Sequence, residues 1–271
     1  MVDAATTGKL TAHIGEEWLQ GQTTYGGLTA ALCLHGGRNV LGDDALPVRS
    51  AHVTFMGPAG ANITIDSTIM KRGKSMAFVQ SELIGAKGVA TSTCLVFGKA
   101  RGSSIDRSFA APPPAGLPPP AASPLLFEAL GFNPPIFTHN FEARLAKGGS
   151  MDGIGTDASN WLWVRHVGAD DEGGIDGVAP DVALLALADM PPPALLPLLP
   201  RGSQFPNVSS ITWMVNWLDD HPAAAPGGWW LLESRAESAR VGYSSQDMSV
   251  WGGDVARGPA LVGRQLVAVY V

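Results

Sequence analysis

The most constraining feature of the sequence is an apolar segment in its second half. Seven consecutive residues, Val182 to Ala188, are all apolar. A helix formed by them would be hydrophobic on every side, and such a helix is buried inside a protein rather than laid on its surface. The rest of the chain must therefore cover this helix all round.

One acidic residue, Asp189, directly follows the apolar run. Pro191 lacks a backbone N–H and fits poorly inside a helix, so we expect the helix to end near Met190 with Asp189 in its last turn. Burial penalises the ionised carboxylate, and the negative end of the helix dipole adds to that penalty. Both effects raise the pKa of Asp189 and make it a better proton acceptor than a surface aspartate.

The composition is that of a globular protein with one large domain or two of ordinary size. Of the 271 residues, 45% are hydrophobic and 15% are charged, which is enough for a large core. The formal net charge of -6 disfavours nucleic-acid binding, which depends on a basic surface. No apolar run reaches the ~18 residues of a membrane span, and the first residues lack a signal-peptide pattern. We expect a cytoplasmic protein that does not insert into membranes.

The first half of the chain predicts one strand, one helix and four antiparallel strands. Residues Leu10 to Leu19 could form the first strand. A helix follows, with Thr23 or Thr24 as its N-cap and Gly36-Gly37 as its end. The four strands are rich in Val, Ile, Thr and Phe and are separated by glycine-containing turns. They are expected at Val48 to Met56, Ile63 to Lys71, Ser75 to Ile84 and Val89 to Phe97.

The same order of elements returns after a proline-rich connector. Strands are expected at Ile136 to Ala146, Asn160 to Val167, Asn207 to Leu218, Trp229 to Ala239, Val241 to Val250 and Ala260 to Val271, with the buried helix after the second. We therefore predict an α+β fold of two repeats, each a helix wrapped by an antiparallel sheet. The expected boundaries are 1-110 for the N-terminal domain, 111-124 for the linker and 125-271 for the C-terminal domain.

Three polar residues could join Asp189. Gln265 lies in an otherwise apolar strand, on the face expected to meet the helix. The two-residue period of a strand puts Ser210 and Thr212 on one face of the strand at 207–218. An acid, an amide and a hydroxyl that converge there could hold one water molecule, from which Asp189 would accept a proton. The alternative is that these groups are hydrogen-bonded parts of the core.

The start of the first helix offers a place for a ligand. It opens on Tyr25-Gly26-Gly27, and glycines let a ligand approach the free N–H groups at the positive end of a helix. We expect the N–H of Gly27 to polarise a substrate carbonyl.

A basic turn gives a weaker signal. Arg72-Gly73-Lys74-Ser75 ends like a phosphate-binding loop, but Thr68 stands where the first glycine is needed, so we reject that motif. Lys71 and Arg72 could still contact a ligand phosphate, and a solvated hairpin turn is the alternative.

Nothing in the sequence indicates a metal or another cofactor. The six histidines lack the spacing of metal ligands. Cys33 and Cys94 lie in apolar or β-branched runs and are expected to be buried free thiols.

Several short segments, spread over nearly the whole chain, form a recognisable set. They are Tyr25-Gly26-Gly27, VRSAHVTFMGP from Val48, KRGKSMAFV from Lys71, Leu187-Ala188-Asp189, Trp229-Trp230-Leu231-Leu232 and Gly263-Arg264-Gln265-Leu266. Taken together, these segments resemble the acyl-CoA thioesterase II family, which includes thioesterase-like proteins of actinobacteria. The resemblance implies a double hotdog fold, in which each long helix is wrapped by a curved sheet and the two sheets join edge to edge.

The resemblance also implies the site residues. In that family an aspartate on the second helix, a threonine or serine on the next strand and a glutamine on the last strand bind the hydrolytic water. These catalytic roles fall on Asp189, Ser210 and Gln265. Serine replaces the more usual threonine, and Thr212 could supply the hydroxyl instead. Expected substrate contacts are Gly27, Tyr25, Thr212, Lys71 and Arg72.

The expected function is hydrolysis of an acyl-CoA thioester to a free fatty acid and CoA, without metal or cofactor, in a protein that could form a homodimer or larger homo-oligomer. We expect an apolar acyl tunnel lined by residues such as Leu28, Leu185 and Trp213. One alternative is a non-catalytic hotdog protein that binds acyl-CoA or lipid. Another is a hotdog hydratase acting on enoyl-CoA, a reaction that usually pairs an aspartate with a histidine.

Overall fold

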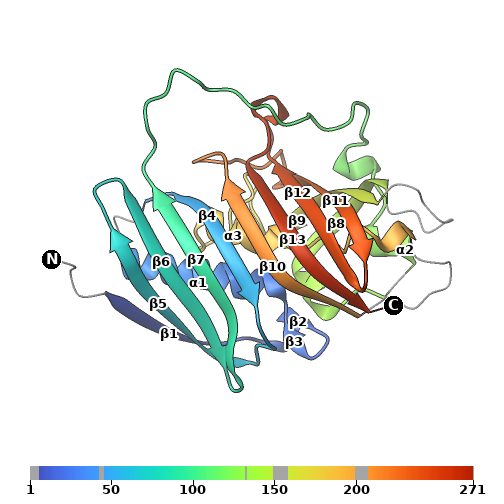
Figure 1. Cartoon of the computed structure of the whole chain (residues 1–271). Helices are drawn as coiled ribbons and strands as arrows, with labels where there is room; N and C mark the ends of the chain where they lie inside the picture. Colours follow the sequence, from blue (N-terminus) through green and yellow to red (C-terminus); the bar gives the residue numbers. More distant parts are fainter. Residues whose placement is uncertain (1–5, 43–45, 132, 149–157, 199–206, 271) are drawn as a thin grey trace.

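One long antiparallel sheet dominates the structure, a computed structural model that describes residues 6–42, 46–131, 133–148, 158–198 and 207–270. Within these ranges the sheet has eleven strands in the order β1-β5-β6-β7-β4-β10-β13-β12-β11-β9-β8. Helices α1 and α3 lie together behind the sheet in Figure 1. The predicted α+β fold with two sheets joined edge to edge is confirmed.

The first half contains the helix and the four strands that the sequence predicts. Its elements are β1 (Thr7–His13), β2 (Leu19–Gln20), β3 (Thr23–Thr24), α1 (Gly26–Leu41), β4 (Val48–Phe55), β5 (Asn62–Arg72), β6 (Met76–Gly85) and β7 (Gly88–Gly98). The predicted first strand is wrong beyond His13. The chain there forms a short 3-10 helix at Glu16–Trp18 and then the small β2-β3 hairpin.

The predicted ends of the first helix are also wrong. Tyr25 is its N-cap residue, and the helix continues through Gly36 and Gly37 to end at Leu41, with Gly42 as the C-cap residue at a φ of 81°. Both glycines face the sheet. A Cβ on Gly36 would lie 2.5 Å from Ile65 Cγ2. The glycine pair therefore allows the helix to pack closely against the sheet, and it does not end the helix.

The second half repeats this plan. Its elements are α2 (Leu126–Leu130), β8 (Phe141–Gly148), β9 (Ser159–His166), α3 (Pro180–Ala188), β10 (Asn207–Trp217), β11 (Trp230–Arg240), β12 (Tyr243–Trp251) and β13 (Leu261–Tyr270). The strand predicted from Ile136 begins only at Phe141, because residues 136–140 form a 3-10 helix.

Strand register shows how closely the halves correspond. Strands β4 and β10 pair antiparallel at the junction, with Val53 opposite Trp213. On either side of this pair, Val53 lies opposite Thr93 of β7 and Trp213 opposite Gln265 of β13. Thr93 therefore occupies in the first half the place of Gln265 in the second.

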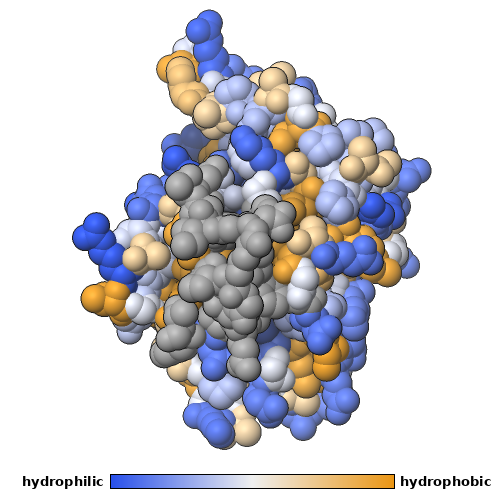
Figure 2. Space-filling view, turned by 90° about the vertical axis from the view of Figure 1, so that its right-hand side faces the viewer, coloured by the Kyte–Doolittle hydropathy of each residue, from blue (hydrophilic) through white to orange (hydrophobic). Residues whose placement is uncertain are grey.

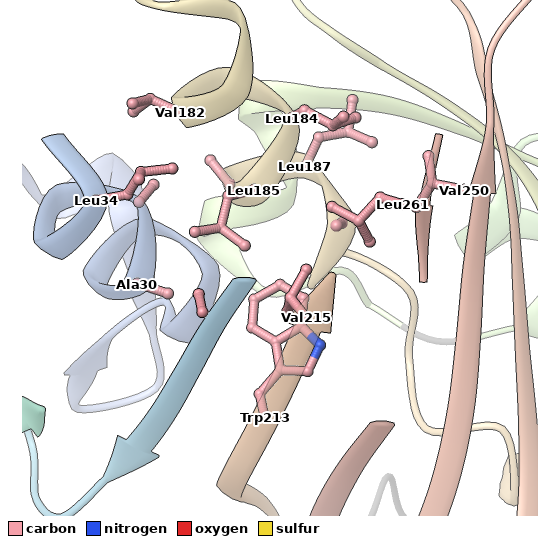
Figure 3. Close-up of a cluster of buried hydrophobic side chains, with 14 of the residues drawn as sticks. Ala30, Leu34, Val182, Leu184, Leu185, Leu187, Trp213, Val215, Val250 and Leu261 are labelled. Atoms are coloured by element: carbon pink, nitrogen blue, oxygen red, sulfur yellow. The ribbon is translucent and has the colours of Figure 1, made fainter. Parts of the chain in front are cut away.

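The core lies between the sheet and the two helices. Every residue from Val182 to Ala188 is at most 7% exposed, as the apolar run predicts. In Figure 3, Leu185 lies on the side of α3 nearer Ala30 and Leu34 of α1, and Leu187 on the side nearer Leu261 of β13. Helix α3 is therefore covered by α1 on one side and by strands of its own half on the other.

The proline-rich connector leads from β7 to the second half as a long irregular trace (Figure 1). It contains a short 3-10 helix at Pro120–Ala122, and the Pro118 carbonyl accepts a hydrogen bond of 2.9 Å from Trp163 Nε1. The connector is thus fastened to β9. The domain boundaries at 110 and 124 remain a prediction.

The surface at the end of the molecule near β8 and α2 is mixed. Figure 2 shows small hydrophobic areas there between hydrophilic ones. In the described part of the chain, no helix combines the length and the hydropathy needed to cross a bilayer.

Gly36 tests the close contact between α1 and the sheet. Gly36→Ala should lower the free energy of unfolding by about 1–3 kcal/mol, because overpacking against the stiff Ile65 outweighs the better helix propensity of alanine. Urea unfolding followed by circular dichroism measures this change. Asn39→Ala, at an exposed position of the same helix, is the control and should be neutral or slightly stabilising. Equal stability of the Gly36 variant and the wild type would contradict the prediction.

Candidate active site

Asp189 is the C-cap residue of α3, as the proline run predicts. It lines a small cavity of about 60 Å³ at the end of the helix, together with Ser210 and Gln265. The three residues come from α3, β10 and β13. The structure therefore brings together the three side chains that the sequence nominates.

Gln265 connects the other two members of this group. Its side chain is buried, and its Nε2 donates to Asp189 Oδ1 over 2.6 Å and to Ser210 Oγ over 3.3 Å. One amide nitrogen thus contacts both the carboxylate and the hydroxyl.

The N-terminal end of α1 completes the surroundings of the carboxyl group. The backbone N–H of Gly27 donates to Asp189. A Cβ on Gly26 would lie 2.9 Å from Asp189 Oδ2, so only glycine permits this approach without displacing the carboxylate. The Gly27 N–H is therefore bound to the acid, which differs from the prediction that it polarises a substrate carbonyl.

Tyr25 has a different place from the predicted one. It is 1% exposed, its hydroxyl donates to the Ala186 carbonyl over 2.8 Å, and its ring stacks on Phe137 at 4.1 Å between centroids. Tyr25 therefore joins α1 to α3, and the prediction that it contacts substrate is not supported by its position.

Burial sets the ionisation of Asp189. Loss of solvation raises its pKa from 3.8 to about 7, while the hydrogen bonds from Gln265 and from Gly27 act in the opposite direction. The carboxyl group is consequently divided between its acid and base forms near neutral pH, as a general base requires.

A β-bulge separates Ser210 from Thr212. Ser210 lies opposite Val267 in β13, whereas Thr212 lies opposite Leu266, because the register shifts between them. Thr212 is exposed and pairs with Thr54 of β4. The prediction of one shared face is wrong, because the bulge reverses the alternation of side chains. Ser210 is the hydroxyl at the site.

The predicted basic contacts also lie elsewhere. Arg72 Nη1 donates to the Leu41 carbonyl over 3.2 Å, at the C-terminal end of α1. Asp189 lies at the N-terminal end of this 16-residue helix, which spans about 24 Å. Lys71, the exposed neighbour of Arg72, is at the same distant end. The fold therefore does not bring Lys71 and Arg72 to the site.

Two adjoining cavities replace the predicted tunnel. A cavity of about 370 Å³, lined by Gly26 and several threonines, shares Gln20, Val208 and Ser210 with the smaller cavity at Asp189. Leu185 and Trp213 are at most 1% exposed and belong to the packed core. The prediction that they line an acyl tunnel is wrong, since side chains fill the space between α3 and the sheet.

Gln246 is a member of the site that the sequence analysis missed. It is buried on β12, and its Nε2 donates to Gln265 Oε1 over 2.8 Å. Its own Oε1 accepts a hydrogen bond of 3.2 Å from the Ala194 N–H. The signal was present in the sequence, because Gln246 alternates with Ser244, Met248 and Val250 on one face of a strand.

The structure offers Asp189 no histidine partner among the described residues that contact it. His166 is buried, and its Nε2 lies 2.9 Å from the Ala183 carbonyl of α3. Burial lowers the pKa of His166 and keeps the ring neutral. In the described ranges, no three His, Cys, Asp or Glu side chains are grouped so that they could hold a metal ion.

Asp189 should make stability depend on pH. The carboxyl ionises near 3.8 in the unfolded chain and near 7 in the fold, so between these values the fold binds more protons and its stability falls as pH rises. The loss is at most about 4 kcal/mol. Asp189→Asn has no such proton to lose, and its Tm should exceed that of the wild type at pH 8 but approach it at pH 4.5. Calorimetry of both proteins at both pH values measures these Tm values. If the Tm difference between Asp189→Asn and the wild type were the same at pH 4.5 and pH 8, the argument would be refuted.

Two models of one protein family match the chain. The acyl-CoA thioesterase C-terminal domain matches residues 111–269, and the acyl-CoA thioesterase N-terminal domain matches residues 14–98. Among curated proteins, no sequence matches this one.

Solved structures share the fold. A conserved protein of unknown function with a hot dog fold from Alicyclobacillus acidocaldarius is 22% identical, with a TM-score of 0.79 over 97% of this chain and 93% of the other. Acyl-CoA thioesterase II TesB2 from Mycobacterium marinum is 19% identical, with a TM-score of 0.66 over 92% and 90%. These likenesses confirm the double hotdog fold. Because the C-terminal family model alone matches more than half of the residues, the chain belongs to the acyl-CoA thioesterase family.

Proposed function

We propose that the protein hydrolyses acyl-CoA thioesters with a water molecule activated by Asp189. The observation that carries this proposal is the pair of hydrogen bonds from Gln265 Nε2, which hold the carboxylate and the Ser210 hydroxyl at one small cavity. Family membership supports thioester hydrolysis in general.

Asp189 serves as the general base. A pKa of about 7 leaves a substantial ionised fraction at neutral pH and gives that fraction far more basicity than a surface carboxylate has. Gln265 holds the carboxylate in place, and Ser210 orients the water through its hydroxyl group.

The reaction proceeds in two steps. The water oxygen attacks the thioester carbonyl carbon while its proton passes to Asp189, and a tetrahedral oxyanion forms. The C–S bond then breaks, the proton on Asp189 passes to the departing sulfur, and a carboxylic acid and CoA thiol are released. The N-terminal turn of α1 lies beside Asp189, and the positive end of the dipole of this helix stabilises the oxyanion.

The two adjoining cavities provide access for the substrate. The larger cavity has about 370 Å³ and meets the smaller one at Ser210. A thioester that lies along both would pass its carbonyl carbon beside the hydroxyl and the carboxylate. Use of acyl-CoA also favours a cytoplasmic location, which remains part of the proposal.

Single substitutions test the three roles. Asp189→Asn should lower kcat by about 10²–10⁴-fold, because the amide cannot accept the proton. Ser210→Ala should lower kcat by about tenfold or more, whereas Thr212→Val, two residues along on the outer face, should leave it unchanged. The assay is thiol release from a panel of acyl-CoAs, measured with a thiol reagent.

The same assay separates the alternatives. Acyl-CoA binding in a calorimeter without thiol release by the wild type would indicate a binding protein. Loss of enoyl absorbance without free thiol would indicate a hydratase. Equal release by the wild type and Asp189→Asn would remove Asp189 from the mechanism.

The pH profile reports the base itself. Since only the ionised carboxylate accepts a proton, kcat/KM should rise with pH through about 7 and then reach a plateau. Gln265→Leu removes a hydrogen bond that lowers the pKa of Asp189, so the rise should move to higher pH. Rates measured from pH 5 to pH 9 test both points, and a flat profile down to pH 5 would exclude Asp189 as the base.

A further inference from the structure

We propose that Gln246 is a positioning residue, which fixes the amide of Gln265 so that its nitrogen, and not its oxygen, faces Asp189. The inference rests on the proposed function, because the group that it controls is the base of that reaction. No motif of the family resemblance includes Gln246.

A primary amide can occupy its site in two orientations that differ by half a turn. In the structure, Gln265 Nε2 lies 2.6 Å from Asp189 Oδ1 and donates to it. In the reverse orientation an oxygen would face that carboxylate oxygen, and two acceptors would repel each other. A protonated Asp189 could donate to the reversed amide. The orientation of Gln265 therefore decides which form of Asp189 is stabilised.

Gln246 selects between these orientations. Its Nε2 donates to Gln265 Oε1 over 2.8 Å, which directs the nitrogen of Gln265 toward the carboxylate. Gln246 is itself an amide that could be reversed, but its Oε1 accepts from the Ala194 N–H over 3.2 Å. A backbone N–H can only donate. The hydrogen-bond chain thus has one direction, from Ala194 through both glutamines to Asp189.

The proline run explains why this N–H is available. Pro191, Pro192 and Pro193 have no N–H, so Ala194 carries the first backbone donor after Met190. Ala194 is fully buried, and a buried N–H requires a partner. The Ala194 N–H thereby attaches the segment that begins at Asp189 to β12.

The other titratable groups described near the site do not orient the Gln265 amide. Tyr25 is the phenol that faces Asp189, and burial raises its pKa so that it stays neutral. On the neighbouring strands, Arg264 and Asp247 pair with each other on the exposed face of the sheet. His166 of β9 turns its Nε2 to a backbone carbonyl of α3.

Two variants and a matched control test the role. Gln246→Leu removes the donor without adding charge and frees Gln265 to turn. Gln246→Glu keeps an acceptor for the Ala194 N–H but offers Gln265 an acceptor in place of a donor, so it favours the reversed amide. The control is Ser244→Ala, at a buried position two residues away on the same face, whose Oγ has no hydrogen-bond partner among the described residues.

Both Gln246 variants should raise the pH midpoint of kcat/KM by about one unit and, since the ionised fraction of Asp189 falls accordingly, lower kcat/KM at pH 7 by about fivefold. The shift should be larger for Gln246→Glu, because its negative charge also disfavours the ionised form of Asp189. Ser244→Ala should keep the wild-type profile. A purely structural role would lower Tm without moving the midpoint. Because Gln246→Leu adds no charge that could itself raise the pKa of Asp189, an unchanged midpoint in folded Gln246→Leu would overturn the proposal.

A readout without turnover separates this inference from the proposed function. The Asp189 carboxyl carbon can be titrated by NMR in protein labelled with ¹³C-aspartate and assigned through Asp189→Asn. Its midpoint should rise in both Gln246 variants even if the wild type releases no thiol. Equal midpoints in the wild type and both variants would refute the positioning role, whatever the activity assay shows.

Discussion

The structure depends on covering one helix that is apolar on every side. Helix α3 cannot remain in contact with water, and its own half of the sheet covers only part of it. Helix α1 of the first half covers the rest, with the Tyr25 hydroxyl bound to the Ala186 carbonyl and Arg38 paired with Asp181 at 2.7 Å. The two repeats are therefore held together by a shared core as well as by the β4-β10 pairing.

This shared core also creates the site. Glycine at positions 26 and 27 allows α1 to meet α3 closely, and the end of α3 places Asp189 at the start of α1. The interior raises the pKa of the carboxyl, and the amide and backbone donors limit that increase. A carboxyl group poised near neutral pH is thus a consequence of how the two halves pack.

The two halves have diverged at equivalent positions. Gln265 in the second half corresponds to Thr93 in the first, and Gln246 corresponds to Ser81, which lies opposite Thr93 as Gln246 lies opposite Gln265. Ser81 Oγ lies 2.8 Å from Ser67 Oγ in the buried interior. The first half thus carries short hydroxyls where the second carries amides long enough to reach an acid, and Asp189 is on the second helix.

The sequence alone determined the repeat, most strands and the burial of α3, because alternation and apolar runs are local patterns with a fixed geometry. The family resemblance nominated Ser210 and Gln265 as the partners of Asp189. Only the tertiary structure decided the rest. Three features depend on contacts between segments far apart in the chain. They are the bulge that turns Thr212 outward, the continuation of α1 beyond Gly36 and the distance of Lys71 from the site. Gln246 belongs to this second group, since its role comes from a donor at Ala194, 52 residues away, that no local pattern relates to it.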